Sequence, residues 1–307
     1  MSATTIETGS GRLLGMTAYG DPSADRVVIL CHPTPGGALD PDPLITEKWG
    51  VRLLAVDRPG YDSSDPVPEG QGWTLTDHAE DIAEFVRRSE RVADQISNAR
   101  LGRYGVIGWG TGGFAAAAIA AHDPKVDRLA LVGVPRPSKR DRFVDRALNE
   151  AGLAALGIEE DDPDLGRHVG LLRRIDRMLE SAHDQGDSGI LRDRELFDHE
   201  EWIDSLGDIR AETHIWVGER DPLVADLDAR WYAERIGRVQ ATRVRDSGPL
   251  TIAAAWRGIL GHVAPEHGSL EQQLRDNGEG RVADIDPREP ELAPYSSEPV
   301  VPTTPRP

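Results

Sequence analysis

Short runs of apolar, β-branched residues alternate with longer stretches of helical periodicity along most of this chain. The runs that predict strands are 12–19, 26–31, 51–56, 103–108, 126–134, 214–217 and 240–244. The stretches that predict helices are one opened by Thr76 or Asp77, then 111–121, 227–236 and 250–263. Strands and helices that alternate in this way are typical of a mostly parallel sheet with helices on both faces. The sequence therefore predicts an α/β fold.

The composition changes twice along the chain. Residues 138–205 are charged and show broken helical periodicity, which predicts a small helical cap inserted into a core formed by 1–137 and 206–268. In the tail, 269–307, eight acidic residues lie within 271–307 and seven prolines follow Asp286. Such a segment has too little apolar surface to offset its ordering entropy, so we expect disorder. The tail is either a solvated appendage or a segment that binds a protein partner around 292–301.

Charge and cysteine content exclude several classes of protein. The 307 residues carry a net charge of −18, with a pI of about 4.9. Such an acidic chain repels nucleic acid and anionic lipid, so neither is expected as a partner. Cys31 is the only cysteine, which excludes an internal disulfide. No secretory signal and no apolar stretch of membrane-spanning length is visible, so a cytoplasmic protein is expected. No pattern predicts a metal or a cofactor.

Three segments carry motifs. They are VILCHPTPGG at 28–37, AVDRPGYDSS at 55–64 and GWGTGG at 108–113. In this order they resemble the α/β-hydrolase family, particularly its esterase, proline-iminopeptidase and haloperoxidase-like branch. The first segment resembles the H-G-x-P-G oxyanion loop, the second is close to the D-R-P-G-Y-G-x-S signature, and the third occupies the place of G-x-S-x-G. The resemblance covers about 12–263 and implies an α/β-hydrolase fold with a mostly parallel central sheet and a helical cap.

The third segment places Gly110 where the resemblance implies the nucleophilic serine. A strand that ends near Gly108 and a helix that begins near Thr111 leave a very tight turn, which forces positive φ at the nucleophile position. Glycine adopts that backbone at little cost but has no nucleophilic atom, so covalent acyl transfer cannot begin there. Thr111 is expected to cap the helix or to lie in its first turn, with its N–H facing the oxyanion site. Cys31 is expected to be buried and inert rather than a reactive thiolate.

The resemblance also implies positions for the acid and the histidine of a catalytic triad. Asp221 falls on the acid position of a G-x-x-D-x-x-V pattern, although it could equally cap the turn before Leu223. Pro249 stands where the histidine is expected, and proline has no acid–base group. His262 lies too far along the last helix to replace it, and His214 begins a strand and is expected to be structural. The cap histidines at 168, 183 and 199 have no spacing that places them in the cleft.

His32, Thr34, Gly36 and Thr111 are the binding and oxyanion candidates. His32 is expected to order its loop through hydrogen bonds, with a general-base role for a non-covalent reaction as the alternative. Asp57 and Arg58 are predicted to form an internal ion pair beside the cleft. Five apolar cap residues either line the cleft or form the cap's own core; they are Leu171, Leu172, Met178, Phe197 and Trp202.

Two hypotheses about function follow. Because Gly110 and Pro249 remove two triad members at independent positions, the first is a non-hydrolytic protein that binds a small molecule in the capped cleft, or a partner through its tail. The second is an active hydrolase or lyase of this fold that uses a non-standard residue such as His32.

Overall fold

A single eight-stranded sheet forms the centre of the molecule. The computed structural model describes residues 2–68, 70–97, 102–199 and 201–265. The strands are β1 (Ser2–Glu7), β2 (Leu13–Gly20), β3 (Val27–Cys31), β4 (Arg52–Val56), β5 (Tyr104–Trp109), β6 (Val126–Val132), β7 (Glu212–Gly218) and β8 (Val239–Val244). Their order is β1-β2-β4-β3-β5-β6-β7-β8. β4, β3 and β5 to β8 are parallel, whereas β1 and β2 are added antiparallel at one edge. The predicted α/β fold is confirmed.

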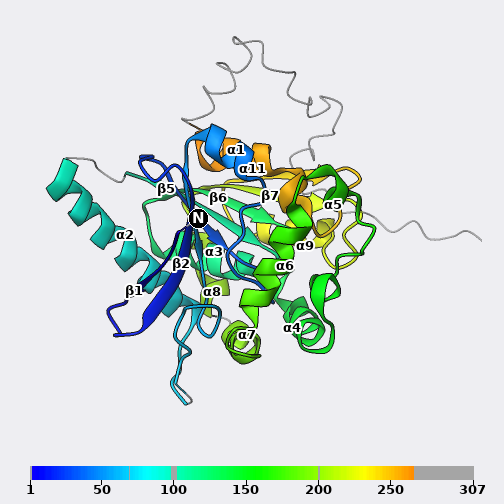
Figure 1. Cartoon of the computed structure of the whole chain (residues 1–307), viewed down its shortest axis with the longest axis horizontal. Helices are drawn as coiled ribbons and strands as arrows, with labels where there is room; N and C mark the ends of the chain where they lie inside the picture. The colour runs from blue at the N-terminus through cyan, green and yellow to red at the C-terminus, as the bar shows by residue number, and fades with distance from the viewer. Residues whose placement is uncertain (1, 69, 98–101, 200, 266–307) are drawn as a thin grey trace, which may run out of the picture.

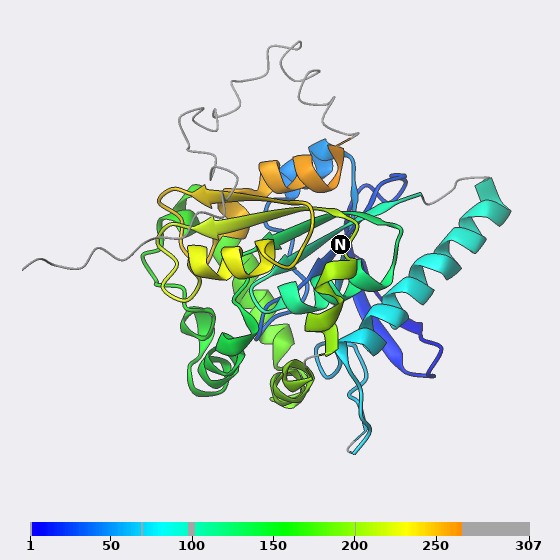
Figure 2. The same cartoon turned by 180° about the vertical axis from the view of Figure 1, so that it is seen from behind.

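Helices cover both faces of this sheet. The longer ones are α1 (Pro43–Trp49), α2 (Leu75–Ser97), α3 (Gly112–His122), α4 (Arg140–Asn149), α6 (Leu171–Ala182), α7 (Ser188–Asp198), α9 (Asp226–Ala233) and α11 (Trp256–Val263). The short ones are η1 (Pro137–Lys139), η2 (Gly152–Leu156), α5 (Pro163–Arg167), α8 (Glu201–Asp204), η3 (Ser205–Asp208) and α10 (Thr251–Ala254). α1 and α11 lie together on one face (Figure 1). Seen from behind, α2, α3 and α9 lie on the other (Figure 2).

Two apolar clusters, one on each face of the sheet, hold these layers together. β5 is buried along its whole length, as expected for a central parallel strand. α3 is apolar on all sides, and it is buried between the sheet and the α2 and η3 helices. β5 and α3 therefore position the turn at Gly110 rigidly.

The structure differs from the expected elements at four places. β1 was not predicted, because its polar, threonine-rich sequence acquires strand structure only by pairing with β2. α1 was also missed, although Asp42 caps it, Pro43 is its first residue and Gly50 ends it in a left-handed conformation. The helix expected to open at Thr76 or Asp77 begins slightly earlier, at Leu75.

The first turn of α2 explains that last difference. Thr74 and Asp77 form reciprocal bonds: Asp77 Oδ2 accepts from the Thr74 N–H at 2.7 Å, and Thr74 Oγ1 accepts from the Asp77 N–H at 3.3 Å. Thr74 is therefore the capping residue. The fourth difference is in the last predicted helix, which is divided into α10 and α11 at Ala255.

The insertion between β6 and β7 is helical in its described part. It contains η1, α4, η2 and α5 to η3, and it ends with α8 and η3 packed on α3. That 138–205 forms a separate cap unit stays a prediction. The predicted disordered tail, 269–307, lies outside the described residues. Within the described ranges, no helix combines the length and the hydropathy that a membrane span requires.

Candidate functional site

The turn between β5 and α3 has the geometry expected for a nucleophile position. β5 ends at Trp109, Gly110 has a φ of +56°, and α3 begins at Gly112. The Gly110 N–H donates to the carbonyl of Val132 at 3.0 Å, which ties the turn to β6. Because this φ is left-handed, glycine is the residue that adopts it without strain.

Gly110, Asp221 and Pro249 line one small cavity. Its volume is about 20 Å³, enough for a water molecule but far below the size of a substrate site. Pro33 and Thr34 line the same cavity. The structure therefore brings together the three predicted triad positions, although they come from the ends of three different strands.

Pro33 is a residue of this site that sequence reasoning missed. A Cβ atom placed on Gly110 would lie 3.2 Å from the Cβ of Pro33, so the proline ring occupies the space in front of the turn. The signal was present in the sequence: the H-G-x-P-G pattern has glycine where this chain has Pro33.

Asp221 is held by its own turn. Its Oδ1 accepts hydrogen bonds from the N–H groups of Leu223 at 2.8 Å and Val224 at 3.0 Å. The turn-capping role expected as an alternative is therefore present. Burial raises the pKa of Asp221 to about 6, and the two backbone N–H groups oppose that rise. No described residue that lines the cavity is a histidine that this carboxylate could orient.

His32 orders its loop and has no ring nitrogen left for a substrate. Nε2 accepts from the backbone N–H of Arg58 at 3.1 Å, so Nδ1 carries the proton and donates to the carbonyl of Pro33 at 2.8 Å. The side chain is 2% exposed, and burial lowers its pKa well below the usual value. Neutral and doubly bonded, His32 has the structural role, and this geometry opposes the general-base alternative.

The predicted ion pair between Asp57 and Arg58 is wrong. Arg58 pairs with Asp193 of α7, through Nε to Oδ1 and Nη2 to Oδ2, both at 2.7 Å. Adjacent side chains on an extended strand end point to opposite sides, so Asp57 cannot reach the guanidinium. Both Asp57 oxygens lack hydrogen-bond partners among the described residues. A residue 135 positions away could not have been identified as the partner from local sequence.

Asp193 also joins the insertion to the candidate site. Its Oδ2 accepts from Thr34 Oγ1 at 2.5 Å and from the Tyr61 hydroxyl at 2.6 Å. Thr34 Oγ1 in turn accepts from Thr111 Oγ1 at 2.8 Å. Asp193 is fully buried, so this network fixes α7 to the loop that carries Thr34 and to Tyr61.

One of the four binding candidates is a described lining residue of the small cavity. Thr34 lines it, whereas His32, Gly36 and Thr111 are not among its described lining residues. Gly36 packs against His32 and Pro33. Thr111 stands at the start of α3, but its side chain makes no capping bond and is used on Thr34 instead. Cys31 is buried as expected, and burial raises the pKa of its thiol to about 12.

His262, His214 and most of the apolar residues of the insertion pack against other groups of the protein. His262 contacts the carbonyls of Leu129 and Glu212, and His214 stacks on Trp216 with ring centroids 3.9 Å apart. Neither they nor the three histidines of the insertion line the cavity at Gly110. Of the five apolar residues expected in the cleft or the cap core, Leu171, Met178, Phe197 and Trp202 are buried in the core clusters and Leu172 is 44% exposed.

Family comparison agrees with this architecture. Residues 28–268 match the model described as alpha/beta hydrolase family. The chain belongs to the α/β-hydrolase family. A comparison with curated proteins finds no match. Within the described ranges, no group of three or more His, Cys, Asp or Glu side chains is arranged to hold a metal ion.

Several solved structures share the fold with this chain at low identity. A hydrolase from Pseudomonas aeruginosa PA01 is 18% identical with a TM-score of 0.64, over 85% of this chain and 97% of that one. The esterase RhEst1 from Rhodococcus sp. ECU1013 is 18% identical with a TM-score of 0.63, over 88% and 100%. The enol-lactonase from Burkholderia xenovorans LB400 is 16% identical with a TM-score of 0.61, over 89% and 98%.

Gly110→Ala is expected to lower the free energy of unfolding by about 2–3 kcal/mol, because the left-handed φ and the contact with Pro33 both oppose a Cβ atom. Gly152→Ala is the matched control. Gly152 has a φ of +59° and no atom within 4 Å of the position that a Cβ would take, so this change should cost only about 1 kcal/mol. Urea denaturation measures both, and equal losses would show that Pro33 does not restrict position 110.

Proposed function

We propose that this protein is a non-hydrolytic member of the α/β-hydrolase family that acts by binding. The observation that carries the proposal is that three of the departures from the family's motifs, Pro33, Gly110 and Pro249, line the same cavity. A nucleophile and its base must lie within hydrogen-bonding reach of one another. The hydroxyl of Thr34 and the carboxylate of Asp221 are the cavity's reactive groups among the described lining residues, and Thr34 already donates to Asp193.

The size of the cavity supports the same conclusion. Acyl transfer needs room for a tetrahedral intermediate between the nucleophile and the oxyanion donors. About 20 Å³ with a proline ring facing the turn does not offer that room. The solved structures named as a hydrolase, an esterase and an enol-lactonase are at most 18% identical to this chain, so their likeness extends to the fold alone.

The test is covalent labelling with a fluorophosphonate probe together with turnover of p-nitrophenyl acetate. We expect no labelling and no hydrolysis above the buffer rate, with the Rhodococcus esterase as a positive control. Turnover that disappears in Asp221→Ala would contradict the proposal. Turnover that survives both Asp221→Ala and His32→Ala would point to a contaminant, which repurification removes.

A variant that restores both missing triad residues tests whether the protein lacks only the reacting groups or also lacks space for a substrate. In Gly110→Ser with Pro249→His, the nucleophile and the base return beside Asp221. Because Pro33 still fills the space in front of the turn, we expect little or no esterase activity from this variant. Adding Pro33→Gly, which restores the H-G-x-P-G pattern, should raise the rate above that of the double variant. Full activity in the double variant would show that Pro33 does not close the site.

A further inference from the structure

A large cavity lies apart from Gly110, between α6 and β2. Its volume is about 1100 Å³, at the upper end of the range of sites that hold small molecules. Thr17 and Tyr19 of β2 and Ala38 and Leu39 of the loop after β3 supply part of its wall. It shares no described lining residue with the small cavity at Gly110. Binding here would therefore not depend on whether the hydrolytic machinery is lost.

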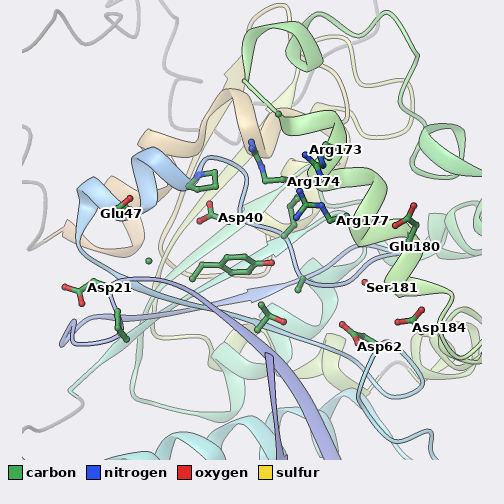
Figure 3. Close-up of a pocket in the computed structure, with 18 residues that line it drawn as sticks. Asp21, Asp40, Glu47, Asp62, Arg173, Arg174, Arg177, Glu180, Ser181 and Asp184 are labelled. Carbon is green, nitrogen blue, oxygen red and sulfur yellow. The ribbon is translucent and has the colours of Figure 1, made fainter. Parts of the chain in front are cut away.

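One face of α6 runs along this cavity. From its N-terminal end the face carries three arginines, and from its C-terminal end it carries acidic groups (Figure 3). The lining positions in order are Gly170, Arg173, Arg174, Arg177, Glu180, Ser181 and Asp184. Their spacing of three to four residues places them on one side of the helix.

At the arginine end, two cations face the cavity unpaired. Arg174 donates to the carbonyls of Val169 at 3.0 Å and Pro41 at 2.8 Å, which ties α6 to the loop before α1. Arg173 and Arg177 are exposed and make no hydrogen bond or ion pair with any described residue. Planar guanidinium groups bind carboxylates and phosphates through paired hydrogen bonds.

At the other end, two carboxylates face one another. Asp62 comes from the loop after β4 and Asp184 from the turn after α6, and they lie close together in Figure 3. Burial, and then the charge of Asp184, raises the pKa of Asp62. Neither carboxylate accepts a hydrogen bond from a described residue. Two carboxylates without a cation between them favour a bound cation.

The charges at the two ends of α6 are arranged in the order that destabilises a helix. A helix is stabilised by acidic groups in its first turn and basic groups in its last turn. The first turn of α6 has no acidic residue and its last turn has no basic residue; arginines and acids occupy the reverse ends. The charge pattern therefore does not serve the stability of α6. It adds to the helix dipole instead, so the N-terminal end is strongly positive and the C-terminal end strongly negative.

We propose that this cavity binds a small zwitterion of tripeptide size, with its carboxylate at Arg173 and Arg177 and its ammonium group at Asp62 and Asp184. A purely anionic ligand is opposed because six carboxylates but three arginines line the cavity. The helical rise accounts for about 7.5 Å between Arg177 and Ala182, the last residue of α6, and Asp184 follows two residues later, which puts the two charged ends on the order of 10 Å apart. Three extended residues span about the same length. The apolar wall at Ala38 and Leu39 accommodates an aliphatic central side chain.

The test uses an equimolar mixture of free tripeptides with the full-length protein. Equilibrium dialysis read by mass spectrometry identifies the peptide retained most, and calorimetry then measures its Kd beside those of its N-acetyl and C-amide forms. We expect saturable binding of the free peptide and at least tenfold weaker binding of each blocked form. No retention of any peptide would overturn the proposal, as would equal binding of the blocked forms.

Variants assign the two ends of the site. Arg173→Gln with Arg177→Gln should weaken binding of the free peptide at least tenfold and abolish the difference between the free peptide and its C-amide form. Asp62→Asn with Asp184→Asn should instead abolish the difference between the free peptide and its N-acetyl form; asparagine also suits the φ of +41° at position 62. Arg142→Gln, at an exposed arginine of α4 outside the cavity, is the matched control.

Melting temperature distinguishes a ligand site from a structural one. Because Arg173 lies at the positive N-terminal end of α6 and Arg177 forms no ion pair with a described residue, the Arg173→Gln, Arg177→Gln variant should melt at the same temperature as the parent or higher. A variant that binds normally would refute the assignment. A variant that loses binding only because its melting temperature falls would show that the charges are structural.

Discussion

Asp193→Asn is expected to lower the free energy of unfolding by about 3–5 kcal/mol, the largest effect of a single substitution that the structure predicts. The change removes the anion that faces Arg58, and both side chains are 1% exposed. Burial lowers the pKa of Arg58, but Asp193 outweighs that effect and holds the group charged. The variant therefore leaves a buried cation without its counter-ion. Urea denaturation at pH 7 measures the loss.

A second substitution on the same helix provides the control. Asp198 of α7 pairs with Arg140 at 2.9 Å, and its side chain is 57% exposed. Because solvent screens exposed pairs, Asp198→Asn should cost less than about 1 kcal/mol. Equal losses in the two variants would show that the buried pair contributes no more than a surface pair.

Amide hydrogen exchange measures which segments lose protection in the Asp193→Asn variant. Asp193 connects α7 to Thr34 and Tyr61, so its loss should speed exchange in α7 and in the loop around Thr34. α11, which packs with α1 on one face of the sheet, should keep its protection. Faster exchange throughout the protein would mean global destabilisation and no specific coupling of the insertion to the site.

The second large effect is a fall in stability as the pH rises from about 4 to 8, which Asp57→Asn should reduce. Burial raises the pKa of Asp57 from 3.8 to about 8. A folded-state pKa above the unfolded value means that the unfolded chain binds fewer protons in this window, so stability is highest at the acidic end and falls towards pH 8. At about 1.4 kcal/mol for each pKa unit, Asp57 accounts for up to roughly 5 kcal/mol of that fall.

Urea denaturation at several pH values between 4 and 8 tests this expectation. Asp40, Asp81 and Asp221 have pKa values raised to about 6, chiefly by burial, so some slope should remain in Asp57→Asn. Asp176→Asn, on the exposed side of α6, should leave the slope unchanged. If Asp57→Asn and the parent have the same slope, the Asp57 carboxyl is ionised and solvated in the folded protein.

Local sequence identified the features that depend on neighbouring residues. The strand-to-helix turn at Gly110, the cap role of Asp221 and the burial of Cys31 each follow from a few adjacent residues and the strand before them. Elements that need a distant partner were not identified. β1 has no apolar alternation and is a strand only because β2 lies beside it.

The charged residues also show the difference between features that neighbouring residues determine and features that need a distant partner. Sequence proximity suggested Asp57 as the partner of Arg58, but the guanidinium points to Asp193 of α7, and Asp57 has no partner among the described residues. Pro33 was visible in the sequence, yet its closeness to Gly110 depends on the pairing of β3 with β5. The cavity along α6 exists because the insertion brings α6 opposite β2, which lies far away from it in the chain.

By itself, the sequence determined the order of most core strands and helices, the family and the absence of a serine and a histidine at positions 110 and 249, because hydrophobic periodicity and motif residues are local properties. Tertiary structure alone decided that Pro33, Gly110 and Pro249 meet at one small cavity, that α7 is fixed by a buried carboxylate and that a ligand-sized cavity lies along α6. These are distances between segments far apart in the chain, and they exist only once the sheet and its helices have packed.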